Sequence, residues 1–178
     1  MLLSLDVGFA NMGWVVFSDG GVFSCGVLRT EKTQRKGARV ADDHAHRSIV
    51  LTSGLNKIIE DYEIKGIIGE LPSGGAQSAK AMGFMMSAIS VAAAVGALWN
   101  IPMEWTTPNE VKKALAGVRN ASKETMMEKA AKAFDFRRDG KSFWFGDEKF
   151  PKGEFEHIAD AIGAYLALKN DNLVKMFG

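Results

Sequence analysis

The sequence predicts an α/β fold with a mixed five-stranded sheet, in which the first three strands are antiparallel and helices flank the sheet. The chain opens with short β-forming runs separated by a turn, and later brief apolar runs alternate with segments of helical periodicity. Its 178 residues, 47% of them hydrophobic, suffice for one domain with a substantial core. We therefore expect residues 1–178 to form a single domain.

The opening of the chain predicts three strands. Leu2, Leu3, Leu5 and Val7 form a short apolar run interrupted by Asp6, residues 13–17 are rich in Trp and Val, and residues 22–28 continue with β-formers. Residues 18–21 read Ser-Asp-Gly-Gly, which is a strong turn signal. An antiparallel meander follows from this order.

Helices and strands should alternate in the middle of the chain. After a polar loop at residues 30–38, apolar residues recur at helical spacing between 49 and 62. Residues 66–70 and 101–106 are brief apolar runs typical of buried strands, and residues 79–98 form a small-residue-rich segment of helical length between them. This alternation supplies the remaining strands of the mixed sheet.

The last third should be mainly helical. Pro108 suits the first turn of a short helix to residue 115, and Ser122 is a suitable N-cap for a helix ending near residue 134. Residues 154–169 carry apolar side chains at helical spacing. Between them, residues 137–153 form an aromatic and charged insertion, which we expect to be functional or mobile.

Composition narrows the function only a little. The net charge of +1, from 22 basic and 21 acidic residues, neither indicates nor excludes a nucleic-acid-binding protein. Neither residues 1–6 nor the apolar residues 82–99 read as a signal peptide or an adequate membrane span. A lone Cys25 cannot form an internal disulfide, so we expect a cytoplasmic protein, with a viral or organellar protein as alternatives.

Four residues stand out as candidates for chemistry. Asp6 lies in an apolar strand, where a buried carboxylate costs several kcal/mol unless a cation pairs with it. Glu70 ends another apolar strand, and His157 and Asp160, three residues apart, share one face of the last helix. Structural explanations stay open for each: a turn, a solvated strand end, or a half-buried histidine beside first-turn acids.

Together, these three carboxylates and one imidazole form a plausible set of ligands for two divalent ions. Two such ions can support in-line attack on a phosphodiester, one activating water and the other stabilising the leaving oxygen. The sequence therefore predicts a metal-dependent nuclease site made of Asp6, Glu70, His157 and Asp160.

The same residues lie in three motifs that resemble those of RuvC-type Holliday-junction resolvases. Residues 2–14, LLSLDVGFANMGW, resemble the first motif, residues 67–70, IIGE, the second, and residues 157–161, HIADA, the last. The motifs are in family order, span most of the chain and are shared across the RNase H-like superfamily. The resemblance therefore implies an RNase H-like nuclease domain.

For function, the resemblance implies a homodimer that nicks two opposed strands of branched DNA symmetrically with Mg2+ or Mn2+, without an organic cofactor or a membrane. Asp6, Glu70, His157 and Asp160 would be the catalytic, metal-binding set, His157 standing where many bacterial members have Asp. Lys112 and Lys123 match basic positions that would neutralise DNA phosphates.

One departure concerns the junction-contacting aromatic that bacterial members carry after the second-motif glutamate. This chain has Pro-Ser-Gly-Gly at residues 72–75, which makes strict sequence preference and a stacking wedge doubtful. The aromatic residues 143–145 would either replace that stacking surface or belong to the local core.

Two alternative functions stay open: a nuclease acting on RNA or RNA/DNA hybrids, and a catalytically silent junction-binding protein. Intact acidic positions argue against the silent protein. The Met- and Ala-rich helix at residues 79–98, which corresponds to a dimer helix in the family, argues mildly against an RNA substrate.

Overall fold

A five-stranded mixed sheet forms the centre of the structure, a computed structural model that describes residues 1–34, 36–37, 39–71 and 78–178. The strand order is β3-β2-β1-β4-β5, with β1, β2 and β3 antiparallel and β4 and β5 parallel to β1. The predicted fold class is therefore confirmed. The strands are β1 (Leu2–Asp6), β2 (Asn11–Ser18), β3 (Gly21–Arg29), β4 (Gly66–Glu70) and β5 (Met103–Thr106).

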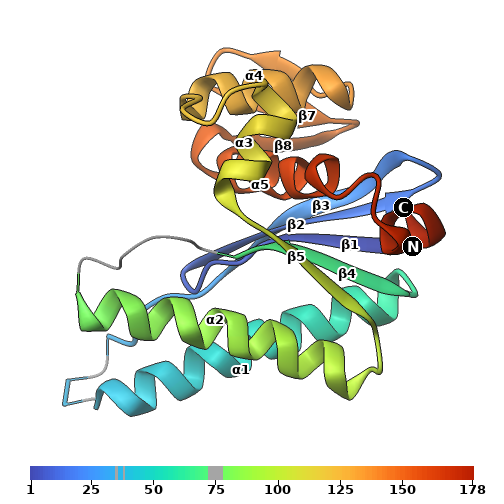
Figure 1. The fold of residues 1–178 in the computed structure, drawn as a ribbon. Coiled ribbons are helices and arrows are strands. Elements are labelled where there is room, and N and C mark those ends of the chain that lie inside the picture. The colour runs from blue at the N-terminus through green and yellow to red at the C-terminus, as the bar shows by residue number, and fades with distance from the viewer. Residues whose placement is uncertain (35, 38, 72–77) are drawn as a thin grey trace.

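Helices cover both faces of this sheet (Figure 1). One face carries α1 and α2, and the other carries α3, α4 and α5, while the short α6 lies beside β4. The helices are α1 (Val40–Asp61), α2 (Ala79–Leu98), α3 (Pro108–Ala116), α4 (Lys123–Ala133), α5 (Lys152–Ala167) and α6 (Asn172–Phe177).

The alternation of side chains along β1 decides which face each residue serves. Leu3 and Leu5 belong to the core under α1 and α2, whereas Leu2 belongs to the core under α5. Ser4 is fully buried and its hydroxyl donates a hydrogen bond of 2.6 Å to the backbone carbonyl of Ala161 in α5. Asp6, two residues further, therefore points to the side of the sheet on which α5 lies.

Two helix predictions differ from the structure. α1 begins at Val40, well before the predicted residue 49, because its first turns are held by buried polar residues that give no apolar periodicity. Asp43 accepts a hydrogen bond of 2.7 Å from the backbone N–H of Thr33. Its Oδ2 atom lies 3.8 Å from a guanidinium nitrogen of Arg47. The second difference is α6, a short helix capped by Asp171 that the sequence did not predict.

The insertion at residues 137–153 is a small folded sheet. It contains β6 (Arg137–Asp139), β7 (Ser142–Phe145) and β8 (Glu148–Pro151) in antiparallel order and leads directly into α5. Phe143 is 1% exposed and stacks on Phe155 of α5 with ring centroids 3.9 Å apart. Of the two roles considered for residues 143–145, the local core is therefore correct for Phe143.

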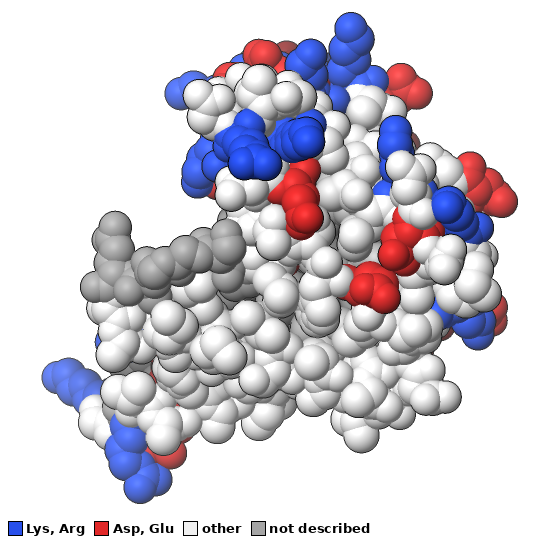
Figure 2. Space-filling model, viewed as in Figure 1, with Lys and Arg blue, Asp and Glu red and all other residues white. Residues whose placement is uncertain are grey.

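α2 is the least covered of the long helices. By length and composition it is apolar enough to cross a membrane, although core helices pass the same test, and 22% of its most apolar window is buried. Its buried residues, Ala88, Ala92, Val95 and Gly96, lie on one side, while Met82 and Met86 are 43% and 52% exposed. Figure 2 shows a surface with few charged residues over this part of the molecule.

Candidate active site

The site starts from two carboxylates at the carboxyl ends of parallel strands. Asp6 is the last residue of β1 and Glu70 the last residue of β4, and the parallel register pairs them directly. Because neighbouring strands lie about 4.8 Å apart and paired residues point to the same face, both carboxyl groups emerge side by side toward α5. Both residues are partly buried.

α5 brings His157 onto the same spot. The His157 Nδ1 atom lies 2.7 Å from Asp6 Oδ2, which joins residues 151 positions apart. This approach depends on Gly13 of β2, since a Cβ atom there would collide with the backbone carbonyl and the Cβ of His157. The hydrogen bond to Asp6 raises the pKa of His157 above its ordinary value, so His157 holds its proton toward Asp6.

Asp160 and Glu70 complete an anionic cluster in which the carboxyl groups oppose one another's ionisation. Burial, with the Asp160 and Asp6 carboxylates, raises the pKa of Glu70 to about 8, which Lys112 partly offsets. Burial, with Asp6 and Glu156, raises the pKa of Asp160 to about 7. Crowded, desolvated carboxylates with raised pKa values are typical of functional sites, including sites that bind a cation.

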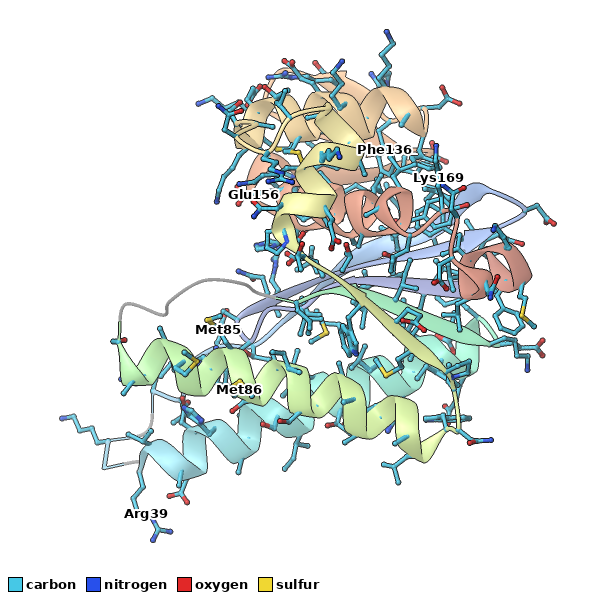
Figure 3. All side chains as sticks on the ribbon, viewed as in Figure 1. Arg39, Met85, Met86, Phe136, Glu156 and Lys169 are labelled. Atoms are coloured by element: carbon cyan, nitrogen blue, oxygen red, sulfur yellow. The ribbon has the colours of Figure 1, made fainter. Side chains whose placement is uncertain are left out.

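Glu156 belongs to this cluster, although from the sequence it fitted a first-turn helix acid better than a ligand. It precedes His157 and lies four residues before Asp160, so it shares a helix face with Asp160. That spacing is the signal that could have found it. Figure 3 shows Glu156 at the part of α5 next to α3.

The two predicted phosphate-binding lysines lie at the same hollow. A hollow of about 220 Å³ lies between β4, α3, α4 and α5 and is lined by both lysines and three acids: Glu70, Lys112, Lys123, Glu156 and Asp160. Lys123 is exposed and pairs with Glu156, while Lys112 is partly buried. Lysines and acids therefore line the same hollow. A phosphate group that enters it could replace a carboxylate as the partner of a lysine.

The chemistry of the donors fits a divalent ion. Mg2+ and Mn2+ prefer carboxylate oxygens, and Mn2+ also accepts imidazole nitrogen. Among the residues that the structure describes, however, no three His, Cys, Asp or Glu side chains converge as a ready metal cage.

The strand order and the helices on both faces are those of an RNase H-like α/β fold, and acids stand at the ends of β1 and β4. No family model matches this chain, and no curated protein matches it. Among solved structures, the chain resembles Thermus thermophilus RuvC in complex with a Holliday junction substrate, with a TM-score of 0.70, 15% identity, and 93% and 90% of the two chains covered. The fold is that of RuvC.

Two further structures show the same likeness. A second Thermus thermophilus RuvC structure matches with a TM-score of 0.66 and 16% identity over 93% of this chain and 91% of that one. The yeast mitochondrial Holliday junction resolvase Ydc2 matches with a TM-score of 0.60 and 16% identity over 98% of this chain and 80% of that one.

Proposed function

We propose that this protein is a divalent-metal-dependent endodeoxyribonuclease that resolves Holliday junctions and other branched DNA by symmetric paired nicks. The observation that carries the proposal is the pairing of Asp6 with Glu70 in register and with His157 of α5, next to Asp160, in a chain with the fold of RuvC. A solved structure with this fold is a RuvC bound to a Holliday junction substrate, which supports branched DNA as the ligand.

Asp6, Glu70, His157 and Asp160 would hold Mg2+ or Mn2+, with Glu156 beside them. Divalent ions there would supply an activated water and stabilise the leaving oxygen of the phosphodiester. Their charge would also relieve the repulsion that raises the pKa values of Glu70 and Asp160. His157 holds its proton at Nδ1 against Asp6 and so fixes the direction of that carboxylate.

Lys112 and Lys123 would bind the DNA backbone on either side of the scissile phosphate. Both line the hollow that also contains Glu70 and Asp160. Lysine contacts to phosphates provide affinity and salt dependence without reading sequence. The paired carboxylate of Glu156 would be released from Lys123 as DNA binds.

We further propose a homodimer built on the exposed side of α2. Met82, Met86, Ser90, Ala93 and Ala97 recur at helical spacing on that side, and all five are exposed. Lys80 is the single charged residue in the helix. An apolar stripe with small residues suits close packing against a second copy, and a two-fold dimer would match the two opposed strands of a junction.

The test incubates the protein and its Asp6→Asn variant with a labelled four-way junction, a linear duplex of the same sequence and an RNA/DNA hybrid. Each is incubated with Mg2+, Mn2+ or EDTA. Asp19→Asn, which alters an exposed acid in the turn between β2 and β3, is the matched control. We expect paired, metal-dependent nicks in the junction, lost in Asp6→Asn and retained in Asp19→Asn.

The other outcomes would replace the proposal. Junction binding without cutting in any metal would indicate a silent junction-binding protein. Preferential cutting of the hybrid would keep the site and overturn the substrate.

A further inference from the structure

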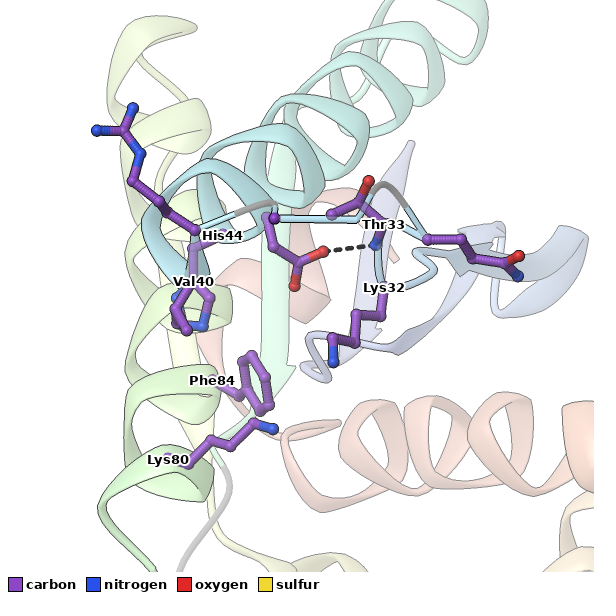
Figure 4. A pocket seen from close by; sticks show the side chains of 10 residues that line it. Lys32, Thr33, Val40, His44, Lys80 and Phe84 are labelled. Atoms are coloured by element: carbon purple, nitrogen blue, oxygen red, sulfur yellow. Dashed lines mark hydrogen bonds between the residues drawn. The ribbon is translucent and has the colours of Figure 1, made fainter.

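A second hollow lies on the opposite face of the sheet from the carboxylates. It has a volume of about 600 Å³, within the range of sites that bind small organic groups. The start of α1, the start of α2 and the segment after β3 surround it, and Figure 4 shows the side chains of Lys32, His44, Lys80 and Phe84 around it.

An aromatic cluster lies against this hollow. The rings of Phe84 and His44 are stacked with centroids 4.8 Å apart, and the ring of Phe9 stacks on Phe84 at 5.3 Å. Arg47 supports the cluster, with its guanidinium 4.5 Å from the Phe9 ring centroid. Phe84 and His44 remain partly exposed, so their rings provide a surface on which another flat ring can stack.

The charges around the hollow favour an anion. Arg39 pairs with Asp42, and the Asp43 carboxylate is held by the Thr33 backbone N–H and by Arg47. Lys32 and Lys80 are exposed and have no ion-pair partner in the part of the chain that the structure describes. Both side chains extend toward the Phe84 ring in Figure 4.

His44 adds an unmet polar atom. Its Nε2 is buried and, among the described residues, has no hydrogen-bond partner. A buried ring nitrogen without a partner costs free energy, but this atom has no surface exposed to the hollow. The ligand is therefore defined by the stacking rings and the two lysines, and a flat ring joined to a negative charge describes a nucleotide.

The hollow is close to the candidate active site along the chain. Phe9 follows Asp6 by three residues, which places their Cα atoms within about 11 Å. The aromatic cluster therefore begins in the same segment of chain that ends the Asp6 strand, although the hollow opens on the other face of the sheet. A base in a duplex cannot stack on this cluster, because its faces are covered by neighbouring bases.

We propose that this hollow binds an unpaired nucleotide of the branched substrate, with the base against Phe84 and His44 and the phosphate on Lys32 and Lys80. The inference rests on the proposed function for its choice of substrate. The site would distinguish a branch point from a linear duplex by the availability of an unstacked base.

The test measures binding separately from cutting. A short single-stranded oligonucleotide carrying 2-aminopurine is titrated with wild-type protein and with Phe84→Leu, which keeps an apolar side chain but removes the ring. Phe23→Leu, at a 55% exposed phenylalanine of β3, is the control, and thermal unfolding checks each fold. We expect Phe84→Leu to weaken binding at least about fivefold and to abolish the change in 2-aminopurine fluorescence.

A second variant leaves the aromatic cluster intact. Lys32→Glu with Lys80→Glu should weaken binding and reduce the salt dependence, by about 0.7 in log-log slope for each lost phosphate contact. Lys169→Glu with Lys175→Glu on the far exposed surface is the charge-matched control. If only the lysine variant changes binding and Phe84→Leu behaves as wild type, the nucleotide site is wrong.

The outcome is independent of whether the protein resolves junctions. Wild-type protein that cuts junctions while Phe84→Leu keeps full binding and the fluorescence change would retain the proposed function and overturn this site. Wild-type protein that binds the oligonucleotide through Phe84 but cuts no junction would retain the site and overturn the resolvase.

Discussion

Replacing Glu70 by Gln should stabilise the metal-free protein at high pH, although it should destroy its activity. Glu70 lies next to Asp6 in register and close to Asp160, and burial with these acids raises its pKa to about 8 from an ordinary 4.5. A raised carboxyl pKa favours the folded state while the group is protonated. That contribution is complete below about pH 4.5 and is lost as the pH rises through about 8.

The size of the effect follows from the same shift. Each unit of pKa difference between folded and unfolded chains corresponds to about 1.4 kcal/mol, so the full shift would cost roughly 5 kcal/mol above pH 8. Glu70 is partly exposed and Lys112 offsets some of the repulsion. We therefore expect Glu70→Gln to raise the free energy of unfolding by about 2 kcal/mol near pH 8.5 and by little near pH 5.

Urea denaturation in EDTA, followed by tryptophan fluorescence, measures this difference at both pH values. Glu104→Gln on the neighbouring strand β5 replaces an exposed acid and should change stability by less than about 0.5 kcal/mol. Mn2+ should stabilise the wild type more than Glu70→Gln, because the proposed metal site includes the Glu70 carboxylate. A Glu70→Gln variant that gains no stability between the two pH values would refute this account of the cluster.

Three other substitutions or reagents test separate parts of the structure. Gly13→Ala should destabilise the protein by about 1–3 kcal/mol and reduce cutting, because the added methyl forces α5 and His157 away from β2; urea denaturation and junction cleavage measure both effects. Met86→Asp, on the exposed side of α2, should convert the proposed dimer to a monomer in light scattering, whereas unchanged mass would show that α2 is not the interface. Cys25 should not react with a thiol reagent in the native protein, because burial raises its pKa to about 12, and reaction should appear only in urea.

Sequence patterns were sufficient for the central sheet and for where its acids emerge. Glu70 ends its strand as predicted, because the apolar run before it is too short to form a helix. The boundaries of α2 and the Ser122 cap of α4 were also predictable, because small-residue periodicity and cap chemistry are local signals.

Other features depended on contacts that no local pattern records. The first turns of α1 are polar because Arg47 and Asp43 are buried against the segment after β3, so apolar periodicity begins late. The stacking of Phe143 on Phe155 makes the small sheet β6-β7-β8 part of the core, and this contact joins residues from different elements. The spacing of Glu156 and Asp160 is visible in the sequence, but the pairing of Glu156 with Lys123 of α4 is a tertiary contact.

The bond between Asp6 and His157 also constrains when the site can exist. It joins β1 to α5, and β1 itself pairs with β4. During synthesis, the first carboxylate therefore waits without its histidine until α5 has been translated and has docked across Gly13. A partly made chain cannot assemble the complete cluster, so the proposed nuclease activity would arise only together with the finished tertiary structure.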